Sequence, residues 1–92
     1  MDYKKVASDI IENVGGKENI KSMTHCFTRL RFVLRDNKKA DKDVVSRLEG
    51  VIQVVEASGQ FQVVLGSKVN KVYDQAVALL GGEMVGEGDV EV

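Results

Sequence analysis

An alternating run of eight residues constrains the fold of this 92-residue chain more than any other feature. Between Thr28 and Arg35, apolar side chains recur at every second position, at Leu30, Phe32 and Leu34. Successive side chains of a β-strand point to opposite faces, so this pattern predicts a strand with one buried face. The two predicted faces hold Thr28, Leu30, Phe32 and Leu34 on one side, and Arg29, Arg31, Val33 and Arg35 on the other.

The rest of the chain alternates between helical and strand patterns. We expect helices at residues 2–14, in a short segment capped by Asp41 and closed by Gly50, and from near Ser67 to Gly81. We expect the other strands at residues 20–25, 51–57 and 60–65, the last two forming a hairpin through Ser58 and Gly59. This α-β-β-α-β-β-α order predicts an α+β fold, a two-layer open-faced sandwich in which a four-stranded antiparallel sheet has three helices on one face.

Residues 1–81 therefore form the predicted domain. The following segment changes in composition, because the last ten residues, EMVGEGDVEV, contain four acidic side chains and no basic one. Segments of high charge and low hydrophobicity bury too little apolar surface to fold. Residues 82–92 are expected to be an acidic flexible tail or linker.

Composition excludes several function classes. With 13 Lys and Arg against 14 Asp and Glu, the chain has no net field that would attract nucleic acid or anionic lipid. One cysteine and one histidine are too few for an internal disulfide or a structural zinc site, so we expect a reducing compartment and no metal. No apolar run reaches the roughly 18 to 20 residues of a membrane span, and the N-terminus does not resemble a signal peptide. We expect a soluble chain.

The candidate chemistry lies in HCFTRLRF, residues 25–32, which contains the only cysteine and the only histidine. Arg29 and Arg31 project to one side of the strand about 6.5 to 7 Å apart, where two guanidinium forks suit a phosphoryl group. Nearby positive charge favours the thiolate of Cys26, which is the nucleophilic form. The pattern alone also fits arginines on an ordinary solvated face and a small buried cysteine.

Two other residues have open interpretations. His25 cannot readily form a Cys/His hydrolase site, because neighbours in a strand point to opposite faces and no second histidine is present to act as the base. It is more consistent with a residue that shapes the turn or touches a partner. Gln62 shares the open sheet face with Gln60, so it either donates to the same anion or simply faces solvent.

The two longest patterned stretches also carry a family resemblance. They read NIKSMTHCFTRLRFVLRD and GVIQVVEASGQFQVVLG. Across residues 3–81 the chain resembles the IIB domain of the glucose-type bacterial phosphoenolpyruvate-dependent sugar phosphotransferase system, most closely its β-glucoside, sucrose and trehalose branch. Phe27 departs from the smaller or aliphatic residue expected after the cysteine of that family.

The resemblance implies a sugar phosphotransferase component that needs no cofactor. Cys26 would accept a phosphoryl group from a phosphohistidine of a IIA domain and pass it to a sugar bound by a membrane IIC domain. Arg29, Arg31 and Thr28 match phosphate-binding positions, and Gln62 matches a glutamine near the phosphoryl group. The implied location is the cytoplasmic side of the bacterial inner membrane, without insertion by this chain.

Two alternatives stay open. One is a regulatory IIB-like domain, and the other is a non-covalent module that binds phosphate or nucleic acid. Phe32 and Phe61 fall on inward faces and leave no aromatic platform for nucleic-acid bases, which speaks against the second. The sugar cannot be inferred, since its selectivity would reside in the IIC domain.

Overall fold

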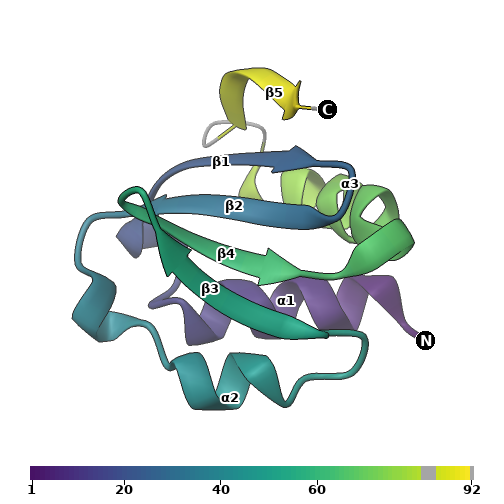
Figure 1. Cartoon of the computed structure of the whole chain (residues 1–92), viewed down its shortest axis with the longest axis horizontal. Coiled ribbons are helices and arrows are strands. Elements are labelled where there is room, and N and C mark those ends of the chain that lie inside the picture. The colour runs from purple at the N-terminus through teal and green to yellow at the C-terminus, as the bar shows by residue number, and fades with distance from the viewer. Residues whose placement is uncertain (82–84, 92) are drawn as a thin grey trace.

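The structure, a computed structural model, describes residues 1–81 and 85–91 (Figure 1). The α-helices and strands run in the order α1 (Tyr3–Asn13), β1 (Ile20–Cys26), β2 (Arg29–Leu34), α2 (Lys42–Ser46), β3 (Gln53–Ala57), β4 (Gln60–Val64), α3 (Val69–Leu80) and β5 (Val85–Glu91). Short 3₁₀ turns occupy Lys17–Asn19, Asn37–Lys39 and Gly66–Lys68. The predicted order of α1 to α3 and β1 to β4 is confirmed. Most boundaries shift by one or two residues, but α2 ends at Ser46 rather than continuing to the expected stop at Gly50.

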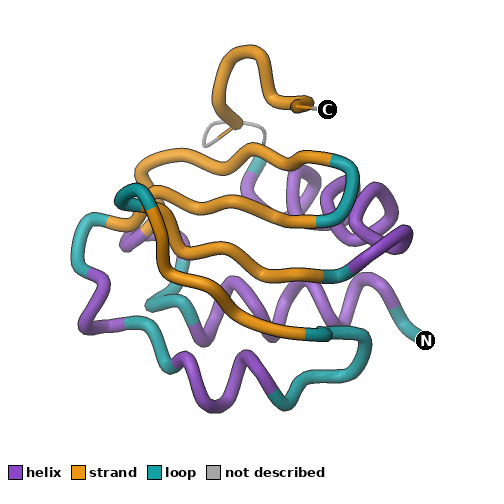
Figure 2. The backbone as a smooth tube through the Cα atoms, viewed as in Figure 1, coloured by secondary structure: helices purple, strands orange, loops and turns teal. Residues whose placement is uncertain are grey.

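The sheet has the strand order β3-β4-β2-β1-β5, and its first four strands pair antiparallel. Figure 2 shows these four strands side by side, with the tight turn between β3 and β4 at one end. Ser58 has φ 55° and Gly59 has φ 73°, the left-handed conformation that a two-residue hairpin turn requires. The predicted Ser58-Gly59 hairpin is therefore confirmed.

One face of the sheet packs against helices and forms the core. Met23, Leu30, Phe32, Phe61 and Val63 are fully or almost fully buried on that face. Helices α1 and α3 supply the opposite side of the core through Val6, Ala7, Ile10, Val69, Val72 and Ala76. Figure 1 looks onto the sheet, with α1 and α3 behind it and α2 beside β3. The α+β two-layer prediction is confirmed. The other face of the sheet, called the open face below, is turned toward the viewer in Figure 1.

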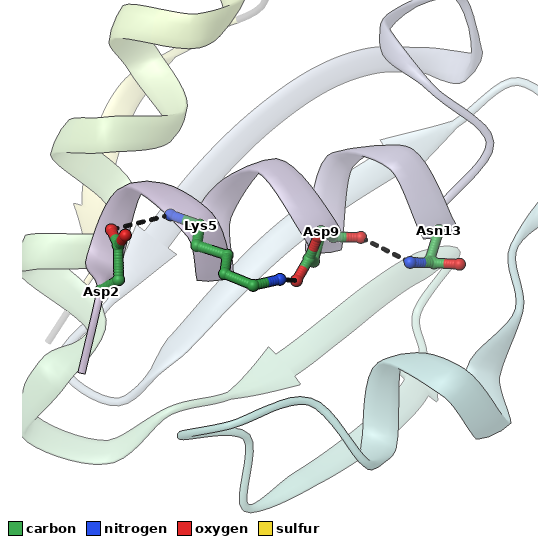
Figure 3. A network of polar contacts seen from close by, with 4 residues as sticks. All are labelled: Asp2, Lys5, Asp9 and Asn13. Atoms are coloured by element: carbon green, nitrogen blue, oxygen red, sulfur yellow. Dashed lines mark hydrogen bonds and ion pairs between the residues drawn. The ribbon is translucent and has the colours of Figure 1, made fainter.

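Helix α1 is fixed at its start by a side-chain cap (Figure 3). The Lys5 backbone N–H donates to Asp2 Oδ1 at 3.1 Å, and the Lys5 ammonium donates to Asp9 Oδ2 at 2.9 Å, one turn further on. Asn13 Nδ2 donates to the Asp9 carbonyl at 2.8 Å near the end of the helix. These contacts stabilise the helix that closes one side of the core.

The acidic C-terminal segment departs from the expected flexible tail. Val85–Glu91 forms strand β5, which pairs parallel to β1 with Met23 opposite Val85 and Cys26 opposite Glu91. Its register shifts between Met23 and His25, so the pairing is irregular. Backbone pairing explains how a segment with few apolar residues can extend a sheet. Residues 82–84 and 92 lie outside the described residues, and the division into domain and linker remains a prediction.

Candidate phosphoryl-transfer site

Cys26 is the last residue of β1, at the loop that leads into β2. This loop is held in place by the segment that follows β4, because the Thr28 carbonyl accepts from the backbone N–H of Leu65 at 2.8 Å and of Gly66 at 3.0 Å. Gly66 has φ 68°, a left-handed conformation that favours glycine. Two hydrogen bonds to one carbonyl therefore hold the loop that follows the Cys26 thiol.

Donors in this loop surround the half-buried Cys26 thiol. Burial by itself would raise the pKa of Cys26, but backbone N–H groups of Thr28 and Arg29 offset this effect. The Thr28 hydroxyl, with Oγ1 4.0 Å from Sγ, acts in the same direction, as does the positive charge of Arg31. The net result is a lowered pKa for the Cys26 thiol. Consecutive N–H groups converging on one point form an anion-binding nest, and the same nest suits thiolate and phosphoryl oxygens.

The strand register places the candidate residues on the open face. Thr24, Arg31, Gln62 and Val55 pair in one row across β1, β2, β4 and β3. Arg29 Nη1 donates to Gln62 Oε1 at 2.8 Å, although the two residues are 33 positions apart in the chain. The sheet thus brings both arginines, Gln62 and the Cys26 loop to one region of a single face.

A family model described as "phosphotransferase system, EIIB" matches residues 8–41, which include Cys26 and both arginines. The crystal structure of one domain of the PTS system IIabc component from Clostridium difficile superposes with a TM-score of 0.80 at 38% identity, covering 84% of this chain and 81% of that chain. The chain belongs to the EIIB family of the phosphotransferase system. This confirms the family suggested by the sequence.

The EIIB chain is similar to one part of several longer phosphotransferase-system components. It is 45% identical over 91 residues to a PTS system beta-glucoside-specific EIIBCA component of Halalkalibacterium halodurans, covering 99% of this chain and 14% of that protein. It is 51% identical over 75 residues to a PTS system sucrose-specific EIIBC component of Bacillus subtilis, covering 80% of this chain and 16% of that protein. The EIIB chain therefore spans less than a fifth of the length of these relatives.

The EIIB structure corrects the expected exposure of the open face. Arg29 and Arg31 are half-buried rather than fully solvated. Gln62 is only 6% exposed, because its amide is engaged by Arg29 and by Gln60. Gln62 therefore points its oxygen at Arg29 and one of its two amide N–H groups at Gln60.

His25 lies on the core side of this EIIB domain. Its side chain is 6% exposed, and its ring centroid lies 4.1 Å from that of Tyr73 on α3. Nδ1 lies 3.0 Å from the Cys26 carbonyl, which can only accept, so Nδ1 carries the proton. Sequence alternation predicts the opposite faces of His25 and Cys26, whereas the Tyr73 contact required the position of α3.

Two features of the EIIB site escaped the sequence analysis. The anchoring of the Thr28 carbonyl depends on Leu65 and Gly66, which are remote in sequence. Gln60 joins the site through Gln62, and its only sequence signal is the i, i+2 spacing of the two glutamines.

Neither a metal site nor a membrane span occurs in the part of the EIIB chain that the structure describes. Among residues 1–81 and 85–91, no group of three or more His, Cys, Asp or Glu side chains could hold a metal ion. No helix within the same ranges is long and apolar enough to cross a membrane.

Proposed function

We propose that this EIIB domain is a phosphoryl carrier that forms a transient S-phosphocysteine at Cys26. The observation that carries the proposal is the Cys26 thiol, which has a lowered pKa in a nest of N–H donors on the face that presents Arg29 and Arg31. The donor would be a phosphohistidine of a IIA domain, and the acceptor a sugar bound by a membrane IIC domain. The names of the EIIBCA and EIIBC relatives support this pair of partners.

In the first step, the Cys26 thiolate attacks the phosphorus of the phosphohistidine. The S–P bond forms as the N–P bond breaks, and the electron pair of the broken bond stays on the imidazole nitrogen. Arg29, Arg31 and the Thr28 hydroxyl would bind the phosphoryl oxygens and compensate their charge, as in other phosphoryl transfers where positioning and electrostatics supply most of the catalysis.

In the second step, a sugar hydroxyl attacks the same phosphorus. The O–P bond forms, the S–P bond breaks, the hydroxyl proton passes to a base of the acceptor site, and the thiolate is restored. The domain would work at the cytoplasmic side of the bacterial inner membrane, where the acceptor component resides. Its transferase activity thus needs both partners, and the sugar would be set by the acceptor.

Intact mass spectrometry tests the proposal. After incubation with a phosphorylated IIA domain, the wild-type chain is expected to gain one phosphoryl group and the Cys26→Ser variant none. A chase with IIC-containing membrane vesicles and the cognate β-glucoside or sucrose should move that group to the sugar. Loading without discharge to any of these sugars would favour a regulatory domain, and no loading would favour a non-covalent phosphate-binding module.

A further inference from the structure

A short hydrogen-bond chain connects Gln60 to Arg29, one of the two arginines of the candidate site. Gln62 Nε2 donates to Gln60 Oε1 at 2.8 Å, and Arg29 Nη1 donates to Gln62 Oε1 at 2.8 Å. All three side chains lie on the open face, and none of them is fully exposed. Gln60 thus reaches the phosphate-binding region through one intermediate residue.

The polarity of this chain is fixed by chemistry. A guanidinium has only donors, so the Gln62 amide must turn its oxygen toward Arg29. The NH₂ of Gln62 then faces Gln60, which must present its own oxygen. Because Gln62 is only 6% exposed, water has little access to replace either partner. An acceptor at position 60 therefore reinforces the orientation of the Gln62 amide that Arg29 requires, whereas a donor there would oppose it.

We propose that Gln60 is a positioning residue for phosphoryl transfer, one that orients the Gln62 amide and thereby holds the Arg29 guanidinium in place on the open face. This inference rests on the proposed function. It gives Gln62 a different task from direct donation to the phosphoryl group, since its oxygen holds the guanidinium. One such bond uses one of five N–H donors, so Arg29 keeps the capacity to bind an anion.

Substitutions at Gln60 separate orientation from charge. Gln60→Lys offers only donors and turns the Gln62 NH₂ toward Arg29, where two donors face each other. Gln60→Glu keeps the acceptor but brings negative charge toward the phosphoryl site. Orientation predicts that Lys impairs transfer and Glu preserves it, whereas simple attraction of an anion predicts the reverse order. Gln60→Met removes the acceptor without charge and serves as the second variant if Lys disturbs folding.

A matched control is Gln53→Lys. Gln53 is exposed, lies on the neighbouring strand β3 and has Val64 as its Cα partner. Gln53→Lys therefore adds the same positive charge to the same sheet, at a position outside the hydrogen-bond chain from Gln60 through Gln62 to Arg29. Thermal unfolding of every variant shows which of them keep the fold.

The transfer rate from a phosphorylated IIA domain is measured in single turnovers over a range of donor concentrations. Gln60→Lys and Gln60→Met are expected to lose about tenfold in the rate at saturating donor, near the upper range for one hydrogen bond, with little change in half-saturation. Gln60→Glu should stay within about threefold, and Gln53→Lys should match wild type. In a Gln62→Leu background, Gln60→Lys should cause no further loss, because the residue acts only through Gln62.

NMR of the unphosphorylated chain gives an independent readout. The Gln62 side-chain amide resonances should shift in Gln60→Lys and Gln60→Met but stay near wild type in Gln60→Glu and Gln53→Lys. Folded Gln60 variants with wild-type rates, or a loss that persists without Gln62, would overturn the positioning role while Cys26 still loads. Absence of loading in the wild-type chain would overturn the proposed function, and the positioning role with it.

Discussion

His25 and Cys26 are neighbours in β1 but serve opposite faces of the sheet. The His25 ring packs on Tyr73 of α3 at 4.1 Å between centroids. The Cys26 thiol, at the end of β1, interacts instead with the Thr28 hydroxyl and the positive charge of Arg31. The two side chains are joined only through the backbone, because His25 Nδ1 donates to the Cys26 carbonyl at 3.0 Å. This arrangement gives the histidine a structural task and separates its ring from the thiol that we propose as the nucleophile.

The first prediction concerns the stability supplied by His25. His25→Leu should lower the free energy of unfolding by about 1 to 3 kcal/mol, because a buried ring contact and the bond to the Cys26 carbonyl are both lost. Urea unfolding measures the difference. Thr24→Val, one position earlier on the opposite face, should change stability by no more than about 0.5 kcal/mol. Equal stability of His25→Leu and wild type would mean that the ring contributes little to the core.

The second prediction concerns the pKa of Cys26. The rate of thiol alkylation against pH should have its midpoint below the ordinary pKa of a cysteine thiol. Because the thiolate is an anion, Arg31→Met removes a favourable charge and should raise the pKa. Arg29→Met keeps its backbone N–H and should shift the midpoint less. A larger shift for Arg29→Met than for Arg31→Met would contradict this division of roles.

The third prediction separates transfer from folding at the two arginines. Alanine at Arg29 or Arg31 should slow phosphoryl passage by roughly two to three powers of ten, the scale for one preorganised stabilising group. Arg29→Ala should also cost about 1 kcal/mol of stability, because Gln62 loses its partner. The rate of phosphoryl transfer is measured in single turnovers, and the change in stability is measured by thermal unfolding. Impairment in Arg29→Lys and Arg31→Lys would indicate that the planar fork matters beyond charge.

The fourth prediction concerns Phe27, which follows the nucleophile and is 63% exposed. Because Phe27 adjoins Cys26 in the chain, we expect a protein that brings a phosphorylated side chain to Cys26 to contact this ring. Phe27→Ser should therefore raise the half-saturating donor concentration about tenfold, a typical loss for an aromatic interface residue, without lowering stability. Leu79→Ser is the control, since Leu79 is an apolar residue that is 39% exposed at the C-terminal end of α3. Equal effects of both changes would argue against a docking role for Phe27.

Periodicity in the sequence was enough to predict the helices and the four antiparallel strands. Val6 and Ile10, for example, share a helix face, and both are buried in α1. Asp41 was predicted as a helix cap, and its side chain does accept from the Val44 N–H at 3.1 Å. Local patterns suffice for these features because each depends on neighbours in the chain.

The site was predictable only in part. Alternation places Gln62 with the arginines, but its burial comes from side chains of Arg29 and Gln60 that meet it across and along the sheet. Strand β5 could not be predicted, because its stability depends on backbone pairing with β1 rather than on an apolar pattern. Contacts between distant segments therefore determine the features that the sequence analysis missed.

The most direct test compares the phosphoryl acceptors side by side. Wild type, Cys26→Ser and His25→Leu are each incubated with a phosphorylated IIA domain, and the modified residue is located by peptide mass spectrometry under conditions that preserve both phosphocysteine and phosphohistidine. We predict one phosphoryl group on Cys26 in wild type and in His25→Leu, and none on Cys26→Ser. A phosphoryl group on His25 in the Cys26→Ser chain, or its absence from the wild-type cysteine, would contradict the account.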